Sequence, residues 1–466
     1  MTHTDIPAFA LVGHPNKGKS SIISTLAYDD SVKISATPGE TTQTKVFPLK
    51  VDGKVQYRLF DTPGFQVPRK VLAWLKAHET TSSRHPEVIR EFLDTHRNDP
   101  AFRDEVELLT PISKGACIVY VVDGSKPYSE EYESEMEILR WSGQPSIALI
   151  NTIDDEDHTI EWEKALNQHF KMVRLFNPMQ VTFSDKTALL DALSQLNSRW
   201  TESLKASMDI LKLYQEQRIN ESAILISENI YHSMTYTLTS SVFKTKISKE
   251  DTHRYAEKYL NHLLNLEQQN QKEIERLWGH AHLVTYNTTQ EFHTMELFSE
   301  QSRKAFGLSK SSLVMASAAA GAVAGGGAGI IFAPIDGGIS TLITASFGAL
   351  TGVFGSLAGY GKYLNIITLG GRFEKKQLQI GPMKDENFPF ILLARSIHHA
   401  TQIAKRSHAV RTKVDLGEHF ADALLDNAQK KELSKIHQQI RKGVKLDQTK
   451  KSYTEIIRTQ LCKNIL

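Results

Sequence analysis

Residues 8–25 read AFALVGHPNKGKSSIIST, and the segment GHPNKGKS within them, from Gly13 to Ser20, fits the pattern GxxxxGK[ST]. An apolar run precedes this segment and a run that can be helical follows it, so the stretch predicts a strand, a glycine loop and a helix. In such a loop, successive backbone N–H groups curl around an anionic phosphate, and glycines permit the curl because they lack a Cβ atom. We therefore expect a phosphate site formed by Gly13, Asn16, Lys17, Gly18, Lys19, Ser20 and Ser21.

Two motifs are expected to contact Mg²⁺ and the terminal phosphate of a bound nucleotide. Lys19 would reach the β- and γ-phosphates of a bound nucleotide, and Ser20 would bind Mg²⁺. A strand predicted over residues 55–60 ends in DTPG, Asp61 to Gly64. A carboxylate at a strand end beside a phosphate loop suits Mg²⁺, so Asp61 would hold the metal, usually through water. Gly64 lets its backbone N–H approach the γ-phosphate, since it has no side chain.

The order GxPNxGKS, then PGxT, then DTPG resembles the Era- and TrmE-like branch of the translation-factor-class GTPases. The resemblance implies an α/β P-loop GTPase domain with a mostly parallel sheet, with GTP or GDP as ligand and Mg²⁺ as metal. It also implies that Thr41 of PGxT closes over Mg²⁺ in the GTP state, with Thr42 as the alternative. Lys19, Thr41 and Gly64 would then carry catalysis.

In this family, guanine is read by an NKxD motif at the end of a later strand. Here the apolar residues 145–150 are followed by Asn151, Thr152, Ile153 and Asp154. Asn151 and Asp154 match the motif, and Asp154 would accept both guanine N–H donors, which adenine cannot supply. Thr152 stands where the family has a lysine, so the resemblance implies guanine specificity with a weakened affinity.

The loop that backs the base in this family, with the motif SAK, is less evident in this sequence. Ser184 precedes a predicted helix over residues 186–196, and we expect it to be the N-cap of that helix. The position of the base-backing loop near Asn177 is left open.

Phe65 occupies the position after DxxG where Ras-type enzymes place a water-orienting glutamine. The sequence therefore resembles the hydrophobic-substituted GTPases, in several of which the asparagine matched by Asn16 helps to hold K⁺. Lys17 is charged where the family often has a small residue, and its ammonium would repel or replace K⁺. We expect slow intrinsic hydrolysis, accelerated by a partner or by self-association.

The chain is expected to have two parts. Residues 5–198 form the GTP-binding domain, with a helical insert at about 68–114. From about Trp200 the apolar residues recur at helical spacing, so residues 199–466 are predicted to form a helical domain without strands. The insert is interpreted as a partner-facing extension or as extra packing.

Residues 312–361 form a Gly/Ala-rich stretch whose single charge is Asp336. Two apolar runs, 313–333 and 339–358, each approach the length that spans a bilayer, and a turn at Pro334 separates them. Glycines recur every fourth residue, which lets helix backbones touch closely. Two interpretations stay open: an apolar helical hairpin that enters membrane lipid, or one buried in protein or in a homo-oligomer interface.

Composition restricts the class of protein further. The chain has 466 residues, a net charge of +2 and two cysteines, Cys117 and Cys462, with no ligand spacing. This favours a cytoplasmic protein, associated with the inner face of a membrane if the hairpin enters lipid, and the start of the chain does not read as a secretory signal. The basic C-terminal part suits anionic lipid, with RNA or the ribosome as the rival partner, and a solvated helix face with no partner is the third interpretation.

Three functions are therefore compared: a membrane-associated GTPase switch, a soluble Era-like GTPase that acts on RNA or the ribosome, and a GTP-dependent scaffold with little hydrolysis.

Overall fold

The computed structural model describes most of the N-terminal half of the chain and parts of the C-terminal half. The described residues are 6–27, 43–51, 53–79, 81–154, 156–240, 246–280, 364–370, 376–386, 388–406 and 425–465. They form two compact units. The first holds the described residues up to Glu216 together with Lys405 and Arg406, and the second holds the other described residues from Gln217 onward.

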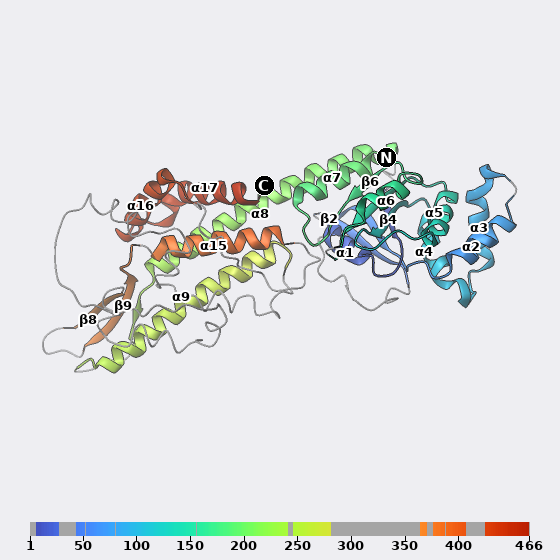
Figure 1. Ribbon diagram of the computed structural model, residues 1–466. Coiled ribbons are helices and arrows are strands. Elements are labelled where there is room, and N and C mark those ends of the chain that lie inside the picture. The colour runs from blue at the N-terminus through green and yellow to red at the C-terminus, as the bar shows by residue number, and fades with distance from the viewer. Residues whose placement is uncertain are drawn as a thin grey trace. The chain divides into compact units, whose positions relative to one another are not determined.

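The first unit is built on a six-stranded sheet in the order β2-β3-β1-β4-β5-β6 (Figure 1). β2 is antiparallel to β3, and the other neighbouring pairs are parallel, which confirms the mostly parallel sheet. The strands are β1 (Ala8–Val12), β2 (Lys45–Val51), β3 (Lys54–Asp61), β4 (Cys117–Asp123), β5 (Ser146–Asn151) and β6 (Val173–Leu175). The helices are α1 (Lys19–Ala27), α2 (Pro68–Ala77), α3 (His85–Thr95), α4 (Arg103–Ser113), α5 (Glu131–Trp141), α6 (Thr159–Leu166) and α7 (Phe183–Ser194), with 3₁₀ turns η1 (Ser82–Arg84), η2 (Pro100–Phe102) and η3 (Ser198–Trp200).

Helices cover both faces of this sheet. Successive side chains of a strand point to opposite faces, so each buried strand contributes apolar side chains to the core on both sides. On one face, Phe9 and Leu11 of β1 join an apolar cluster with α1 and α7. On the other face, Ala10 and Val12 join a cluster with the helices α2 to α6. All four side chains are fully buried. Because β1, β3, β4, β5 and β6 run parallel, their carboxyl ends lie at the same edge of the sheet, and the loops that follow these strands lie there too.

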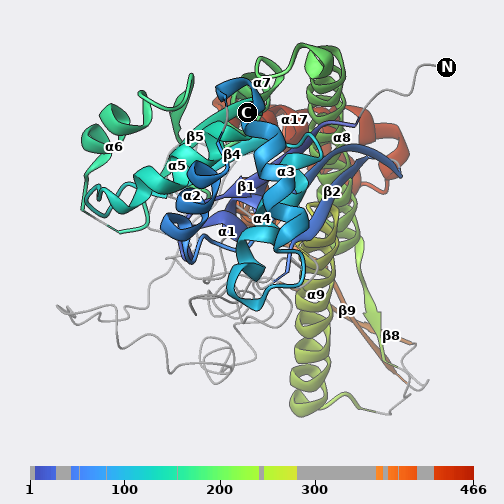
Figure 2. The ribbon, with the colours of Figure 1, turned by 90° about the vertical axis from the view of Figure 1, so that its right-hand side faces the viewer.

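The insert between DTPG and β4 is helical, as the periodicity predicted. Figure 1 shows α2 and α3 beside each other beyond α4 and α5, and Figure 2 shows α3 and α4 in front of the strands. Val71 of α2, Phe92 of α3 and Leu108 of α4 are fully buried in the same apolar cluster as Val12. The insert therefore packs on the core of the domain through these side chains.

The expectation that Ser184 caps a helix is wrong by two residues. α7 begins at Phe183, and its N-cap is Thr182. The Thr182 Oγ1 accepts the Asp185 N–H at 3.2 Å, and the Asp185 carboxylate accepts the Thr182 N–H at 2.8 Å. A capping box requires the N-cap residue and its partner to be three positions apart, and Thr182 and Asp185 have this i, i+3 spacing.

The described part of the second unit is mainly helical, and its buried apolar residues form one core. The helix α8 (Thr201–Thr235) contributes side chains to the cores of both units: Leu204 belongs to the core of the first unit and Ile219 to the core of the second. The helical spacing that begins at about Trp200 is confirmed by two long helices, α8 and α9 (Lys249–Leu277). The remaining elements are β7 (Leu238–Thr239), β8 (Leu364–Leu369), β9 (Gln377–Met383), α15 (Phe388–Lys405), α16 (Asn427–Arg441) and α17 (Leu446–Ile465).

The expectation of no strands after Trp200 is wrong. β7, β9 and β8 form a three-stranded antiparallel sheet in the second unit, in that order. In β9, Leu378 and Ile380 are buried and alternate with the half-buried Gln377 and Gln379, which is the two-residue period of a strand with one buried face. This alternating pattern in the sequence is short, and it is followed by Gly381 and Pro382, which are residues that are unusual inside strands.

The apolar stretch 312–361 lies outside the described residues. Within the described ranges, no helix combines the length and the apolar character that crossing a lipid bilayer requires.

Candidate functional site

The P-loop lies between the end of β1 and the start of α1, at the carboxyl edge of the sheet. Asn16 is exposed and has a φ of 61°, a left-handed conformation that asparagine tolerates. Gly18 has a φ of +86°, and a Cβ atom there would lie 2.3 Å from Nδ2 of Asn151. A side chain at position 18 would therefore be strained and would also collide with Asn151. Ser21, in the first turn of α1, is half-buried.

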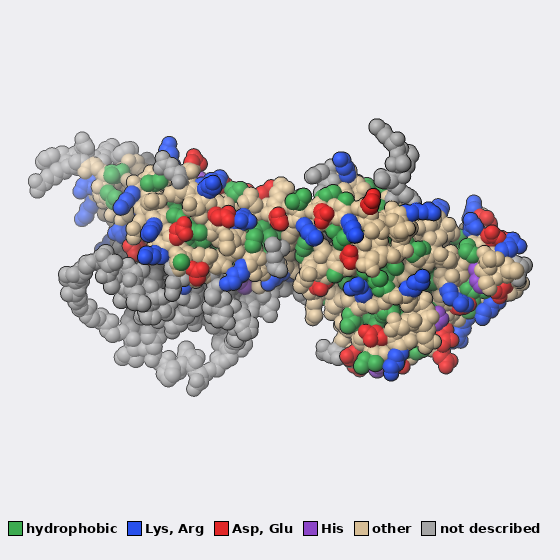
Figure 3. Space-filling view, turned by 90° about the horizontal axis from the view of Figure 1, so that it is seen from above, with side chains coloured by type: hydrophobic (Ala, Val, Ile, Leu, Met, Phe, Trp, Pro, Cys, Tyr) green, Lys and Arg blue, Asp and Glu red, His purple; other side chains and the backbone are tan. Residues whose placement is uncertain are grey.

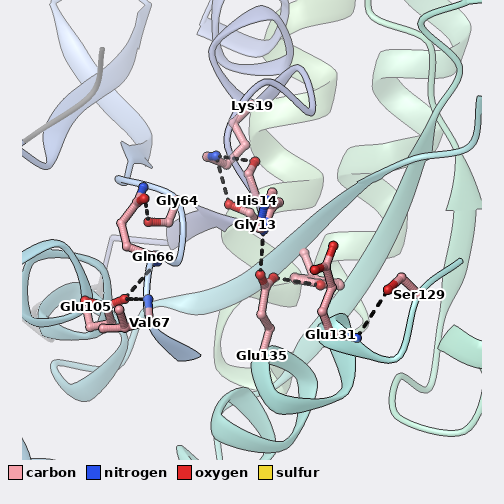
Figure 4. A network of polar contacts seen from close by, with 11 residues as sticks. Gly13, His14, Lys19, Gly64, Gln66, Val67, Glu105, Ser129, Glu131 and Glu135 are labelled. Atoms are coloured by element: carbon pink, nitrogen blue, oxygen red, sulfur yellow. Dashed lines mark hydrogen bonds and ion pairs between the residues drawn. The ribbon is translucent and has the colours of Figure 1, made fainter. Parts of the chain in front are cut away.

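Lys19 is buried and turns back over the loop (Figure 4). Its Nζ donates to the carbonyl oxygens of Gly13 at 2.9 Å and His14 at 3.0 Å. Burial lowers the pKa of Lys19 to about 8, although the carboxylates of Asp61 and Glu135 oppose that shift. The ammonium group thus lies at the loop that is expected to hold phosphate, with neutral oxygens as its hydrogen-bond partners there.

Ser20 and Asp61 come together from different elements, as the motifs predicted. Ser20 Oγ donates to Asp61 Oδ2 at 2.9 Å. The second carboxylate oxygen, Oδ1 of Asp61, is buried and has no hydrogen-bond partner. Burial raises the pKa of Asp61, while the hydrogen bond from Ser20 and the charge of Lys19 act in the opposite direction. A hydroxyl beside a buried carboxylate with an unused oxygen is a donor set that fits Mg²⁺, which prefers oxygen ligands.

The DTPG loop lies directly on the P-loop. A Cβ atom at Gly64 would stand 2.5 Å from Cδ of Pro15, so only glycine permits this approach. Thr62 Oγ1 donates to the carbonyl oxygen of Leu11 at 2.6 Å and ties the loop to β1. Phe65 is 1% exposed and belongs to the core, which removes it from any water-orienting role. Gln66 is exposed at this loop, and its Nε2 lies 3.5 Å from the carbonyl oxygen of Gly64.

The candidate guanine loop is joined to the P-loop. Asn151 is buried, and its Nδ2 donates to the carbonyl oxygen of Lys17 at 3.1 Å. Asp154 is half exposed, and its Oδ2 lies 2.8 Å from Nζ of Lys126. Asn177 Nδ2 donates to both the carbonyl oxygen and Oγ1 of Thr152, at 3.1 and 3.3 Å. The loop of Asn177 therefore lies beside the position where the family has its lysine.

One predicted residue of this site is not described, and one buried carboxylate beside the P-loop was not predicted. Thr41, the residue expected to close over the metal, lies outside the described residues. Glu135 of α5 is buried, its Oε1 lies 3.0 Å from Nδ1 of the P-loop His14, and its Oε2 accepts from the Tyr120 hydroxyl at 2.9 Å. Glu135 and Lys126 belong to no motif, so only the folded arrangement identifies them.

Comparison with known families agrees with this geometry. Residues 163–463 match the family model described as a domain of unknown function (DUF3482), and residues 8–152 match the model described as 50S ribosome-binding GTPase. The chain belongs to the DUF3482 family. In this DUF3482 chain, a region that matches a P-loop GTPase domain of the translation-factor class precedes the family region, which confirms the resemblance inferred from the motifs.

Curated relatives of the DUF3482 chain are similar over part of their length. GTPase Der of Mycoplasma pneumoniae is 25% identical over 223 residues, which are 46% of this chain and 44% of that protein. GTPase Der of Agathobacter rectalis is 42% identical over 173 residues, 36% of this chain and 32% of that protein. The chain thus spans less than half the length of these relatives. A crystal structure of Era with MgGDPNP and nucleotides 1506–1542 of 16S ribosomal RNA is 13% identical, with a TM-score of 0.29, over 59% of this chain and 90% of that one.

Proposed function

We propose that this DUF3482 protein binds GTP and GDP with Mg²⁺, hydrolyses GTP slowly and acts as a nucleotide-controlled switch. The observation that carries the proposal is the hydrogen bond between Ser20, in the first turn of α1, and Asp61, at the end of β3, beside the P-loop over which Lys19 turns back. The GTPase-domain match over residues 8–152 supports it independently.

In this proposal each residue has a defined task. The Lys19 ammonium attracts the β- and γ-phosphates, and the backbone N–H of Gly64 donates to the γ-phosphate. Ser20, Asp61 and Thr41 hold Mg²⁺, which neutralises phosphate charge when it is bound. Asn151 fixes the loop from which Asp154 accepts the guanine N–H donors, while Gly13, Asn16, Lys17, Gly18 and Ser21 complete the cradle. Loss of the γ-phosphate would release the Thr41 and Gly64 loops, and the second unit would respond to that change.

The test is calorimetric titration of the full chain with GTP and GDP in Mg²⁺, with ATP as the comparison. Lys19→Ala should abolish measurable binding, whereas Lys205→Ala, which removes an exposed lysine of α8, should not alter it. Absence of heat with guanine nucleotides, or full binding by the Lys19→Ala variant, would contradict the proposal. Single-turnover hydrolysis then separates an enzyme from a GTP-dependent scaffold.

Contact with a membrane is a finer proposal that rests on the sequence of residues 312–361 alone. A stretch of this length with the single charge Asp336 suits lipid, but it equally suits burial in protein or in a homo-oligomer. Flotation of the full chain with anionic vesicles, compared with a chain lacking residues 312–361, distinguishes these. Unchanged flotation after the deletion removes the lipid hypothesis, and light scattering reports the oligomer.

Binding to RNA or the ribosome is the second candidate, because one matched family is described as 50S ribosome-binding GTPases. On the face shown in Figure 3, Lys and Arg side chains are interspersed with Asp and Glu over the described part of each unit. Mixed charge of this kind gives weak attraction to phosphate backbones, so affinity for RNA would have to come from elsewhere. Co-sedimentation with ribosomes, with GTP or GDP and at two salt concentrations, tests this candidate.

A further inference from the structure

The helix α4 contacts the backbone that follows each of the two candidate nucleotide-sensing loops. Glu105, in its first turn, is 1% exposed, and its Oε1 accepts the backbone N–H groups of Gln66 at 2.8 Å and Val67 at 2.7 Å (Figure 4). Glu107, two residues later, accepts the backbone N–H of Thr44 at 3.0 Å through Oε2. The Thr44 hydroxyl also donates to the carbonyl oxygen of Glu107 at 2.8 Å.

These contacts fall close to the predicted switching residues. Val67 follows Gly64 by three residues, and Thr44 follows Thr41 by three residues. Gly64 itself lies against Pro15 of the P-loop. A displacement of the backbone at Val67 would therefore move the Gly64 N–H relative to the phosphate cradle.

The helix α4 is a firm support for such contacts. Leu108, Leu109 and Ile112 on its inner face are all fully buried. A well-packed core resists small displacements, so the two glutamates are fixed relative to the sheet. Glu105 and Glu107 thus hold both loop ends to one rigid element.

The local chemistry explains why a carboxylate is found at position 105. Val67 is the N-cap residue of α2 and has no side chain that can accept a hydrogen bond. The first N–H groups of a helix need acceptors, and a negative charge at this end is favourable. Glu105 supplies this charge from another helix, and it accepts the N–H of the N-cap residue Val67 together with that of Gln66, which precedes the helix. Charge-assisted hydrogen bonds are about twice as strong as neutral ones.

We propose that Glu105 is a positioning residue that holds the Gly64 loop in the conformation that receives the γ-phosphate, and that α4 couples this loop to the segment after Thr41 through Glu107. The inference rests on the proposed GTP-binding function. A role limited to capping α2 would affect both nucleotides alike, whereas positioning of Gly64 concerns only the nucleotide that has a γ-phosphate.

The test compares Glu105→Gln with the full-length parent by calorimetry, using GDP and the non-hydrolysable analogue GppNHp in Mg²⁺. The amide keeps the shape of the side chain but loses its charge, and hydrogen bonds to charged groups are worth more than neutral ones. We expect GppNHp to bind about tenfold more weakly and GDP to change by less than about twofold. Glu87→Gln, at an exposed glutamate of α3 paired with Arg84, should change neither.

A second measurement covers the case in which Glu105→Gln does not fold. Hydrogen exchange of the parent chain should show that GppNHp, compared with GDP, protects peptides over residues 43–51 and 62–71 together. Protection of one peptide alone overturns the coupling, and an unchanged ratio of GppNHp to GDP affinity in Glu105→Gln overturns the positioning role. If the parent chain bound neither nucleotide, the proposed function would fail first, and the inference with it.

Discussion

Ser20 Oγ donates to Oδ2 of Asp61 at 2.9 Å, so the first turn of α1 is joined to the end of β3 by a single hydrogen bond. Ser20 and Asp61 are separated by 41 positions in the chain. Their meeting follows from β1 and β3 being parallel neighbours, since both strands then deliver their following loops to the same edge. The free Oδ1 of Asp61 leaves this pair able to take part in binding a cation.

The first prediction is that Asp61→Asn removes the dependence of GTP affinity on Mg²⁺. The asparagine oxygen can still accept the Ser20 hydroxyl, so the local fold is kept, but the charge that attracts the metal is lost. We expect GTP affinity in Mg²⁺ to fall about 10- to 100-fold, as changes beside a metal typically do. Titrations with Mg²⁺ and with EDTA measure this. Equal loss of affinity in EDTA would show that Asp61 acts without the metal.

The second prediction concerns the base. In Asp154→Asn, the amide can donate to the C2 carbonyl of xanthine but no longer accepts both guanine N–H groups. GTP affinity should therefore fall by about 10- to 100-fold, and XTP affinity should rise. Competition titrations with GTP, XTP and ATP measure the change.

Lys126→Ala is the matched control for Asp154. The ion pair between Lys126 and Asp154 is half exposed on both sides, and such pairs contribute at most about 1 kcal/mol. GTP affinity should change by less than about fivefold in this variant. A larger loss would show that Lys126 takes over a task of the lysine that Thr152 replaces.

The third prediction is that turnover is equal in KCl and in NaCl at the same ionic strength. Lys17 Nζ lies 3.5 Å from Oδ2 of Asp123, so a cation already accompanies the P-loop beside Asn16. The Lys17→Ala variant lacks the ammonium group and has a small side chain at this position, as the family often does. We expect K⁺ to stimulate that variant if the ammonium excludes the ion. Stimulation of the parent chain by K⁺ would contradict this view.

The P-loop, DTPG and the Asn151–Asp154 loop could be predicted from the sequence because each is a short contiguous segment with its own spacing. Glu105, Glu135 and Lys126 could not, since each acts on a distant segment through a contact that only the tertiary structure forms. The sequence also showed Thr152 as a departure from the family, yet its hydrogen bonds with Asn177 depend on how two loops meet.

The second unit shows a further limit. Its helices were predicted because apolar residues recur over many turns, whereas the strands β8 and β9 are short. β7 pairs with β9 through Leu238 and Ile380, so two segments far apart in the chain complete one sheet. A two-residue strand has no detectable period of its own, and its pairing is decided by the core on which the sheet packs.

The last prediction is a loss of stability of the second unit in mild acid, caused by His437. This side chain is 4% exposed; its Nε2 lies 3.0 Å from the Tyr453 hydroxyl, and its Nδ1 has no partner. Burial, with a contribution from Arg441, lowers the pKa of His437 from 6.5 to about 3. Above pH 6.5 the imidazole is neutral whether the chain is folded or unfolded, so it contributes no pH dependence there. Below that value only the unfolded chain takes up the proton, and the free energy of unfolding falls by about 1.4 kcal/mol per pH unit.

Between pH 6.5 and 5.0 this amounts to about 2 kcal/mol, and the loss continues until the pH approaches the folded pKa. The measurement is urea unfolding at the two pH values, followed by pulsed hydrogen exchange of peptides from α16 and α17. His437→Gln, which does not titrate and can still bond Tyr453, should lose a large part of the pH dependence but not all of it, because burial also lowers the pKa of His398, in α15 of the same unit, to about 4. His232→Gln, at an exposed histidine of α8, should retain all of it. Equal pH dependence in the parent chain and in His437→Gln would assign the effect to other groups.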